Sequence, residues 1–225
     1  MNKEYISKLF YEDEDYINAA LYAATEHDRW SNVIFAKSLL FQGKLDDAYF
    51  EFRQLKMDYE AGYCQLLKGF LFLAEKIWAT SHHQDSFDIS WGLSLLSFLN
   101  GDRIKYPLYF QIRSFLEQDI NMFFKIGKSD YVNKLIEHAD VFARINPESY
   151  KFFGRVLFHN QKYDYAREFL KLSLNVCFKD PETHFLIAGL HVLDKNISSA
   201  RKSLKTAIDV SGGYYPAEIM LREIK

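Results

Sequence analysis

The sequence predicts an all-α protein built from antiparallel helix pairs, for two reasons. First, residues that break helices are rare. The 225 residues include four prolines and ten glycines, fewer than a β-sandwich or an α/β domain of this length needs for its turns. Second, two similar segments, Pro-Glu-Ser-Tyr and Pro-Glu-Thr-His, begin at residues 147 and 181, 34 residues apart. A fixed period of this length is typical of arrays in which each repeat is one helix pair.

The two segments agree in kind beyond their first four residues. Counted from residues 147 and 181, small side chains recur at positions 8, 20 and 27: Gly154, Ala166 and Ser173 in one repeat, and Ala188, Ala200 and Ala207 in the next. Small residues are needed where two helices cross closely, because a larger side chain would push the helices apart and leave voids. We therefore expect Gly154 to face Ala166, with short polar turns at 160–162 and 194–196.

Over residues 147–214 this pattern resembles the tetratricopeptide repeat family. The resemblance implies an α-solenoid in which tetratricopeptide-type antiparallel helix pairs stack into a right-handed superhelix. Moving the repeat boundaries back by 34 residues gives a further repeat at 113–146. In this repeat the larger residues Ile120 and Val132 stand at positions 8 and 20, where the helices cross. The span 113–214 is therefore predicted to hold three 34-residue repeats, of which the first is degenerate.

The N-terminal block, 1–62, is predicted to hold a first helix, half a repeat and one complete repeat. The complete repeat, 29–62, has Ala36 at position 8, a Gly-Lys turn and Ala48 at position 20. These are the positions at which the C-terminal repeats also place small residues. The following segment, 63–112, loses the period and is predicted to form irregular helices.

Within this irregular segment we expect one long apolar helix over 63–80, a loop at 81–86 and a second helix over 87–99 that ends at an Asn-Gly pair. Glycine directly after a helix is a common terminator. A proline opens one more helix in the last segment, 215–225, which either caps the array or continues into a longer protein. The whole chain, 1–225, is expected to form a single domain.

Charge and hydropathy exclude several classes of function. The formal net charge is −2 and both signs are interspersed, so no basic face for nucleic acid is expected. The longest apolar stretches are too short or too interrupted by charges to span a bilayer, and the N-terminus lacks the apolar core of a signal peptide. We interpret Cys64 and Cys177 as small core residues in a reducing compartment. An intracellular, soluble protein without membrane contacts is expected.

Residues 1–30 depart from this balance of charge. They contain seven acids against three bases, with an unbroken acidic run at 12–15. The run has two interpretations. It is a docking patch for a basic partner, or a solvated loop that also places negative charge at a helix N-terminus.

The sequence contains no recognised motif for catalysis, cofactor binding or metal binding. The Gly-Lys-Ser at 127–129 has Met122 where a phosphate-binding loop needs glycine, so we interpret it as an inter-helix turn. His184 and His191 are seven residues apart, not at metal-ligand spacing, and we interpret both as core residues. The adjacent histidines at 82–83 are expected to point in diverging directions, which does not favour binding of one metal ion by both. We therefore predict a protein that is not an enzyme and has no cofactor or metal site.

The inner surface of the stacked helix pairs is the candidate groove for other protein chains. The groove residues that we predict are Lys151, Arg155, Phe158, His159 and Phe185. A basic ledge beside an apolar floor would suit a peptide that has a carboxylate and apolar anchors. The alternative is that Lys151 and Arg155 only make the surface soluble.

A second candidate surface is the N-terminal end of the array, which carries more apolar residues than an end should. The residues that we expect to form a homodimer interface are Tyr5, Leu9, Phe10, Trp30, Val33, Leu40 and Phe41. Left in water they would form a large exposed patch, whereas a two-fold arrangement would bury the patches of both copies at once. The alternative is that the first helix folds back and caps its own array.

The segment 16–75 resembles a narrower group. Its order is Asn-Ala-Ala-Leu at 18–21, Gly-Lys at 43–44, Asp-Ala-Tyr at 47–49 and Cys-Gln-Leu-Leu at 64–67. This is similar to the N-terminal domains of the tetratricopeptide subunits of the anaphase-promoting complex (cyclosome), although those proteins are longer. The resemblance implies a homodimeric scaffold subunit of this ubiquitin ligase in cell-cycle control, in nucleus and cytoplasm. The competing hypothesis is a small bacterial adaptor or secretion chaperone that binds a peptide in its concave groove.

Overall fold

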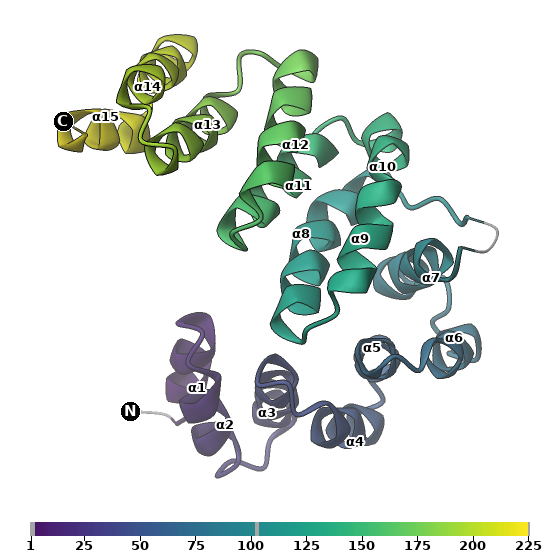
Figure 1. Cartoon of the computed structure of the whole chain (residues 1–225). Helices are drawn as coiled ribbons and strands as arrows, with labels where there is room; N and C mark the ends of the chain where they lie inside the picture. The colour runs from purple at the N-terminus through teal and green to yellow at the C-terminus, as the bar shows by residue number, and fades with distance from the viewer. Residues whose placement is uncertain (1–2, 102–103, 225) are drawn as a thin grey trace. The chain divides into compact units, whose positions relative to one another are not determined.

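The computed structural model describes residues 3–101 and 104–224, with side chains from residue 6 onward, and contains no strand within these ranges. The prediction of an all-α protein is confirmed (Figure 1). The helices are α1 (Lys3–Glu12), α2 (Tyr16–Ala23), α3 (Arg29–Phe41), α4 (Leu45–Leu55), α5 (Asp58–Lys68), α6 (Leu71–Ala79), α7 (Phe87–Asn100), α8 (Tyr109–Lys125), α9 (Ser129–Glu137), α10 (Ala139–Ile145), α11 (Ser149–His159), α12 (Tyr163–Val176), α13 (Pro181–Leu193), α14 (Ile197–Ser211) and α15 (Tyr215–Glu223).

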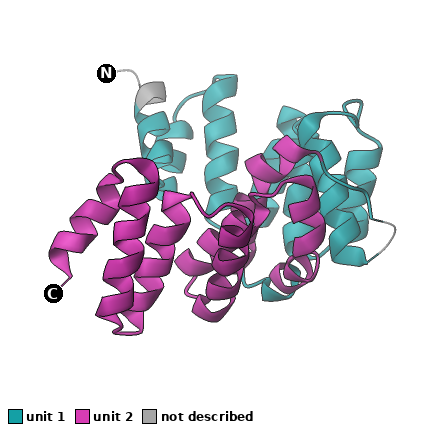
Figure 2. Cartoon of the chain, turned by 90° about the horizontal axis from the view of Figure 1, so that it is seen from above, with its two compact units in different colours: residues 1–107, 125–131 teal, residues 108–124, 132–225 magenta. Residues whose placement is uncertain are grey.

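The chain forms two compact units (Figure 2). Unit 1 comprises residues 1–107 and 125–131, and unit 2 comprises 108–124 and 132–225. Successive helices pack as hairpins: α3 with α4 and α5 with α6 in unit 1, and α11 with α12 and α13 with α14 in unit 2. In unit 2, α11 also contacts α13, the corresponding helix of the next pair. These are the contacts of tetratricopeptide-type helix pairs. The superhelix and the single domain stay predictions.

Short turns join the helices of each pair in the C-terminal repeats, as the pattern predicts. Gln161 and Lys195 take positive φ angles of 60° and 58°, and each stands in the middle of its turn. Gly127, with a φ of 75°, lies in the turn between α8 and α9. The interpretation of the Gly-Lys-Ser sequence as an inter-helix turn is thereby confirmed.

Small residues at the predicted crossing positions of unit 2 are buried, and the nearest contact of Gly154 is with Leu170. Ala166 and Ala188 are fully buried. Gly154 is buried too, but a Cβ atom added there would lie 2.7 Å from Cγ of Leu170 and 3.2 Å from its backbone nitrogen. The nearest neighbour of Gly154 on α12 is therefore Leu170, which lies one helical turn along α12 from Ala166.

The prediction of one long helix over 63–80 is wrong. Gly69 takes a φ of 93° and ends α5 at Lys68, after which α6 folds back against α5. A left-handed glycine satisfies the last carbonyls of a helix and reverses the chain, so it is a common helix terminator. Helix α5 begins at Asp58, and the block boundary expected at residue 62 therefore falls inside it. This part of the irregular segment is a regular helix pair.

The core of unit 1 contains Trp78, whose ring is fully buried between two glycines. Its Nε1 donates a hydrogen bond to the carbonyl of Tyr59 at 3.0 Å, and the two rings stack at 5.9 Å. A Cβ atom added at Gly62 would lie 2.2 Å from Nε1, and one at Gly92 would lie 2.8 Å from the indole ring. Glycine at both positions makes room for Trp78 between α5 and α7, where the core is close-packed.

Two elements of the array differ from a regular repeat. Helix α1 packs against α2 and α3 of its own unit, so it covers the end of its own array. In the repeat predicted at 113–146, the second helix is divided at His138 into α9 and α10. This is also the repeat in which the sequence places large residues at the helix crossing, so its departure from a regular helix pair is consistent with the sequence.

The cysteines and histidines are only partly as predicted. Cys64 is fully buried, and burial raises the pKa of its thiol to about 12. Cys177 is exposed, so its interpretation as a core residue is wrong; it follows the end of α12 in extended backbone. His184 is buried, and its Nε2 is 2.8 Å from the carbonyl oxygen of Phe178, which confirms a core role. Within the described residues, no helix combines the length and apolar character needed to cross a membrane.

Candidate protein-binding surfaces

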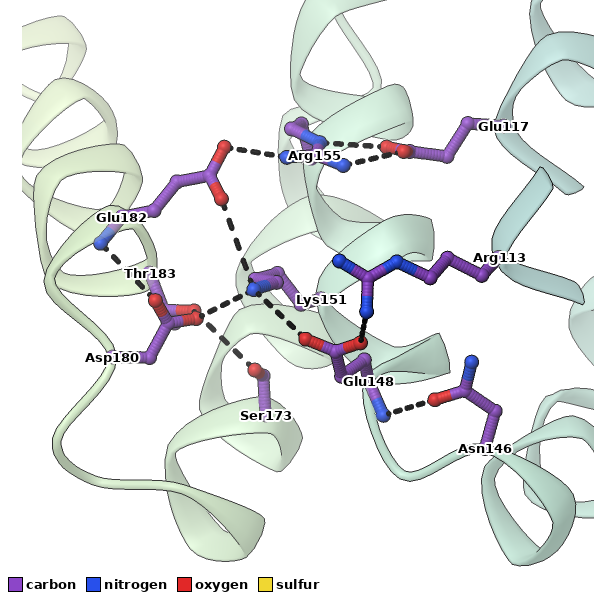
Figure 3. Close-up of polar contacts among 10 residues, drawn as sticks. All are labelled: Arg113, Glu117, Asn146, Glu148, Lys151, Arg155, Ser173, Asp180, Glu182 and Thr183. Carbon is purple, nitrogen blue, oxygen red and sulfur yellow. Dashed lines mark hydrogen bonds and ion pairs between the residues drawn. The ribbon is translucent and has the colours of Figure 1, made fainter. Parts of the chain in front are cut away.

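Lys151, predicted to line the groove, lies among three carboxylates of unit 2 (Figure 3). Its Nζ is 3.4 Å from an oxygen of Asp180, 3.5 Å from Glu148 and 3.8 Å from Glu182. The side chain is only 16% exposed. Helix α11 supplies Lys151, while the start of α13 supplies two of the acids. A lysine surrounded in this way is not a free cation on the surface.

Arg155, one turn further along α11, joins the helices on both of its sides. Its Nε donates to Glu117 of α8 at 2.7 Å, and a second guanidinium nitrogen donates to the other oxygen of that carboxylate. Its remaining nitrogen donates to Glu182 of α13 at 2.6 Å. The hydrogen bond to Glu117 is the main cause that raises the pKa of Arg155 above its ordinary value. Bidentate pairs of this kind are the stronger class of ion pair.

Helix caps hold the acidic partners in place. Asp180 is the N-cap of α13 and accepts from the backbone nitrogen of Glu182 at 3.3 Å and from Oγ1 of Thr183 at 2.6 Å. Before α11, the side-chain oxygen of Asn146 accepts from the backbone nitrogen of Glu148 at 3.0 Å. Because an N-cap side chain is fixed by the helix it caps, the carboxylate of Asp180 is positioned by the backbone of α13 before it meets Lys151.

These contacts form an ion-pair ladder across α8, α11 and α13, in which three cations face four carboxylates: Arg113, Lys151 and Arg155, with Glu117, Glu148, Asp180 and Glu182. The ladder has no surplus of positive charge. The expected basic ledge for a ligand carboxylate is therefore corrected: its two cations are paired within the chain.

The apolar floor of the predicted groove is also partly used by the fold. Phe158 packs on the cluster of Leu170, Leu186 and Leu190 and covers Gly189, where an added Cβ atom would lie 3.0 Å from the phenyl ring. Phe185 is half-buried, with its ring 5.8 Å from that of Tyr214. His159 is exposed and lies at the edge of the Phe158 ring. The structure thus brings these residues to one face but leaves only His159 largely free.

In the N-terminal block, two of the predicted interface residues are well exposed. Trp30 is 52% exposed and Leu9 is 39% exposed. Val33 is half-buried. The side chain of Tyr5 lies outside the described residues. Leu9 and Trp30 therefore remain candidates for an interface.

The other three predicted interface residues contact their own unit. Leu40 is buried. Phe10 stacks on Tyr22 with ring centroids 5.3 Å apart, and Phe41 stacks on Tyr16 at 4.8 Å. The rings of Phe10 and Phe41 are thus partly covered by α1 and α2 of their own unit. The alternative interpretation, in which the first helix caps its own array, accounts for these two positions.

Two further apolar residues of α2 were not predicted. Ile17 and Leu21 are 64% and 62% exposed, and they stand one helical turn apart on the same face. The opposite face of α2 buries Ala19, Ala20 and Ala23. The exposure of apolar residues on α2 could have been predicted from its sequence, Tyr-Ile-Asn-Ala-Ala-Leu-Tyr-Ala, which has no polar face. A helix that is apolar all round is expected to be covered on all sides.

Comparison with known proteins adds one structural likeness. No model of a protein family and no curated protein sequence matches the chain. A search of solved structures finds a chain in the crystal structure of the APC/C hetero-tetramer Cut9-Hcn1, with 16% sequence identity and a TM-score of 0.43. The match covers 99% of this chain and 42% of the other, so this chain spans less than half of its length. The helix pairs, their turns and the 34-residue spacing themselves define a tetratricopeptide-type repeat architecture.

Proposed function

We propose that this protein is a scaffold that holds other protein chains and has no catalytic role. The observation that carries the proposal is a set of exposed large apolar side chains on the N-terminal helices: Leu9, Ile17, Leu21 and Trp30. Large apolar side chains gathered on a few short helices mark surfaces that other proteins cover.

The partner that best fits this surface is a second copy of the chain. In a two-fold dimer the same patch is present on both sides, so each copy buries what the other exposes. The interface that we now propose is centred on α2, with Leu9 and Trp30 at its border. This shifts the predicted interface away from Phe10, Leu40 and Phe41, which contact their own unit.

The assembly that we propose for the dimer is the anaphase-promoting complex, a ubiquitin ligase of the cell cycle. Support for this finer proposal comes from the resemblance of residues 16–75 to the N-terminal domains of its tetratricopeptide subunits. The protein would then act in nucleus and cytoplasm, with other subunits as partners and without contacts to nucleic acid or membrane. The competing proposal of a peptide adaptor has less support, because Lys151 and Arg155 are engaged with carboxylates of the chain itself.

Sedimentation equilibrium of the full chain tests the dimer. We expect a dimer at tens of micromolar, and a helical monomer after the double change Ile17→Glu and Leu21→Glu, because charges at an apolar interface resist desolvation. The matched control is Phe72→Glu on α6, an exposed aromatic outside α2, which should leave the dimer intact. An unmodified chain that is monomeric at this concentration, or a control that dissociates equally, would show that α2 is not the interface.

A further inference from the structure

A hollow of about 390 Å³ opens in unit 1 beside the N-terminus of α2 and the C-terminus of α3. Its walls combine two aromatic rings with acidic and basic side chains, and the lining residues are Glu14, Asp15, Tyr16, Ile17, Phe41, Gln42, Lys44 and Lys125. The hollow shares Ile17 with the exposed face of α2, but the aromatic rings and the charged residues are not part of that face or of the ion-pair ladder of unit 2.

The aromatic wall is a fixed part of the fold. The rings of Tyr16 and Phe41 stack at 4.8 Å with an angle of 17° between their planes. Tyr11 packs edge-on against both, at 5.6 Å and 6.0 Å. The side-chain amide of Gln42 donates to the carbonyl of Tyr16 at 2.8 Å, which ties the start of α2 to the end of α3. The rings are therefore held in position without any ligand.

The chain places one of its own cations on this wall. The Nζ atom of Lys125, which belongs to unit 1, lies 5.0 Å from the ring centre of Tyr16 and 6.0 Å from that of Phe41. The face of an aromatic ring carries partial negative charge, so it attracts an ammonium or guanidinium group within about 6 Å. The position of Lys125 shows which chemistry the wall accepts.

The acidic run beside the hollow supplies negative charge that offsets the two lining lysines, Lys44 and Lys125. Glu14, which lines the hollow, and the preceding residue Asp13 are exposed, and neither forms an ion pair in the part of the chain that the structure describes. Asp15 is instead the N-cap of α2 and is bound to Asn18. With seven acids against three bases over residues 1–30, the region attracts basic partners over several ångströms. The cap formed by Asp15 agrees with the interpretation that the acidic run places negative charge at a helix N-terminus. The docking-patch interpretation is the one that the proposal below uses.

We propose that this hollow binds a lysine or arginine side chain from a basic segment of a partner protein, and that Lys125 occupies the site when no partner is present. The incoming cation would take the ring faces of Tyr16 and Phe41, while the acidic run would contact the flanking basic residues. Lys125 would then move into the open part of the hollow or into solvent. The proposal rests on the scaffold function proposed above and names a class of partner for it.

A peptide titration by fluorescence polarisation tests this site in the full chain. The probe is a fluorescein-labelled Gly-Lys-Gly-Gly-Lys-Gly-Gly-Lys-Gly, compared with the same peptide carrying norleucine in place of lysine. The change Lys125→Met removes the ammonium group from the ring faces, and we expect it to tighten lysine-peptide binding about threefold to tenfold, in line with the strength of a cation–π contact. Adding Tyr16→Leu to this variant should remove the gain.

The matched control is Lys44→Met, which removes one positive charge from the same hollow but leaves the cation on the rings in place. Equal gains from Lys125→Met and Lys44→Met would overturn the proposal, because net charge alone would then explain the binding. Equal binding of the norleucine peptide, or no binding by Lys125→Met, would also overturn it. If circular dichroism shows that Tyr16→Leu loosens the fold, Phe41→Leu serves instead. Sedimentation of the same samples reports the dimer separately, so failure of the scaffold dimer and failure of this site are distinguishable.

Discussion

Gly154 is a residue of α11 that has no room for a side chain against α12. An added Cβ atom would meet both the side chain and the backbone nitrogen of Leu170. A flexible side chain can move aside, but a helix backbone cannot move without shifting the whole hairpin. This position therefore tests whether the repeat register assigned from the sequence is the one that the fold uses.

We predict that Gly154→Leu lowers the thermal unfolding midpoint of the chain, measured by circular dichroism. Overpacking of a close-packed crossing costs about 1–3 kcal/mol or more. The control is Lys171→Leu, an apolar change at an exposed position of α12, which should have little effect. A midpoint that stays unchanged in Gly154→Leu would contradict the close contact with Leu170.

At the scale of an element, the hairpin of α5 and α6 depends on one backbone conformation. Gly69 adopts a φ of 93° between the two helices, a region that residues with a Cβ atom rarely enter. Without that conformation the apolar sequence from α5 into α6 would favour a continuous helix, as the sequence predicted. Trp78 would then leave its place between Gly62 and Gly92.

We predict that Gly69→Ala destabilises unit 1 by about 1–2 kcal/mol, the cost of a left-handed conformation for an ordinary residue. Gly69→Asn should be milder, because asparagine tolerates this region better than alanine. Urea unfolding followed by tryptophan fluorescence measures both. If Gly69→Ala and Gly69→Asn lower the free energy of unfolding equally, the destabilisation comes from the added side chain near Lys128 and not from the backbone conformation.

The elements that the sequence predicted best are those under local constraint. The pairs at 147–214 could be found because their crossings need small residues at fixed spacing, and Gly101 ends α7 as expected, with a φ of 73°. The ion-pair ladder could not be found. Arg155 pairs with residues 38 and 27 positions away, and a cation at a groove position looks the same in a sequence whether it faces water or a carboxylate.

At the scale of the whole molecule, the two units differ in the groups that titrate at alkaline pH. In unit 1, burial raises the pKa of Cys64 from 9.0 and of Tyr11 from 10.0, both to about 12. Unit 2 has no buried cysteine, since Cys177 is exposed. Burial also raises the pKa of Tyr150 and Tyr214 there, but from an ordinary value of 10.0.

A group whose pKa is raised by folding contributes stability that is complete below its unfolded pKa and is lost as the pH rises toward the folded value. For Cys64 this loss begins near pH 9, the ordinary value of the thiol, and continues to about pH 12. For the tyrosines of unit 2 it begins about one pH unit higher, near 10. Raising the pH should therefore weaken unit 1 before unit 2.

The tryptophans make this difference measurable, because Trp30, Trp78 and Trp91 all lie in unit 1. Tryptophan fluorescence reports unit 1 alone, whereas circular dichroism reports the helices of both units. We predict that between about pH 8 and about pH 10.5 the urea midpoint seen by fluorescence falls more than the midpoint seen by circular dichroism, since each unit loses stability according to its own titrating groups. Cys64→Ala should reduce the fall in the fluorescence midpoint, because unfolding of unit 1 then no longer releases a buried thiol; the remaining thiol, Cys177, lies in unit 2 and is already exposed in the folded chain. Coincident midpoints at both pH values would show that the units unfold together, and an unchanged fall in Cys64→Ala would assign the effect to groups other than the thiol.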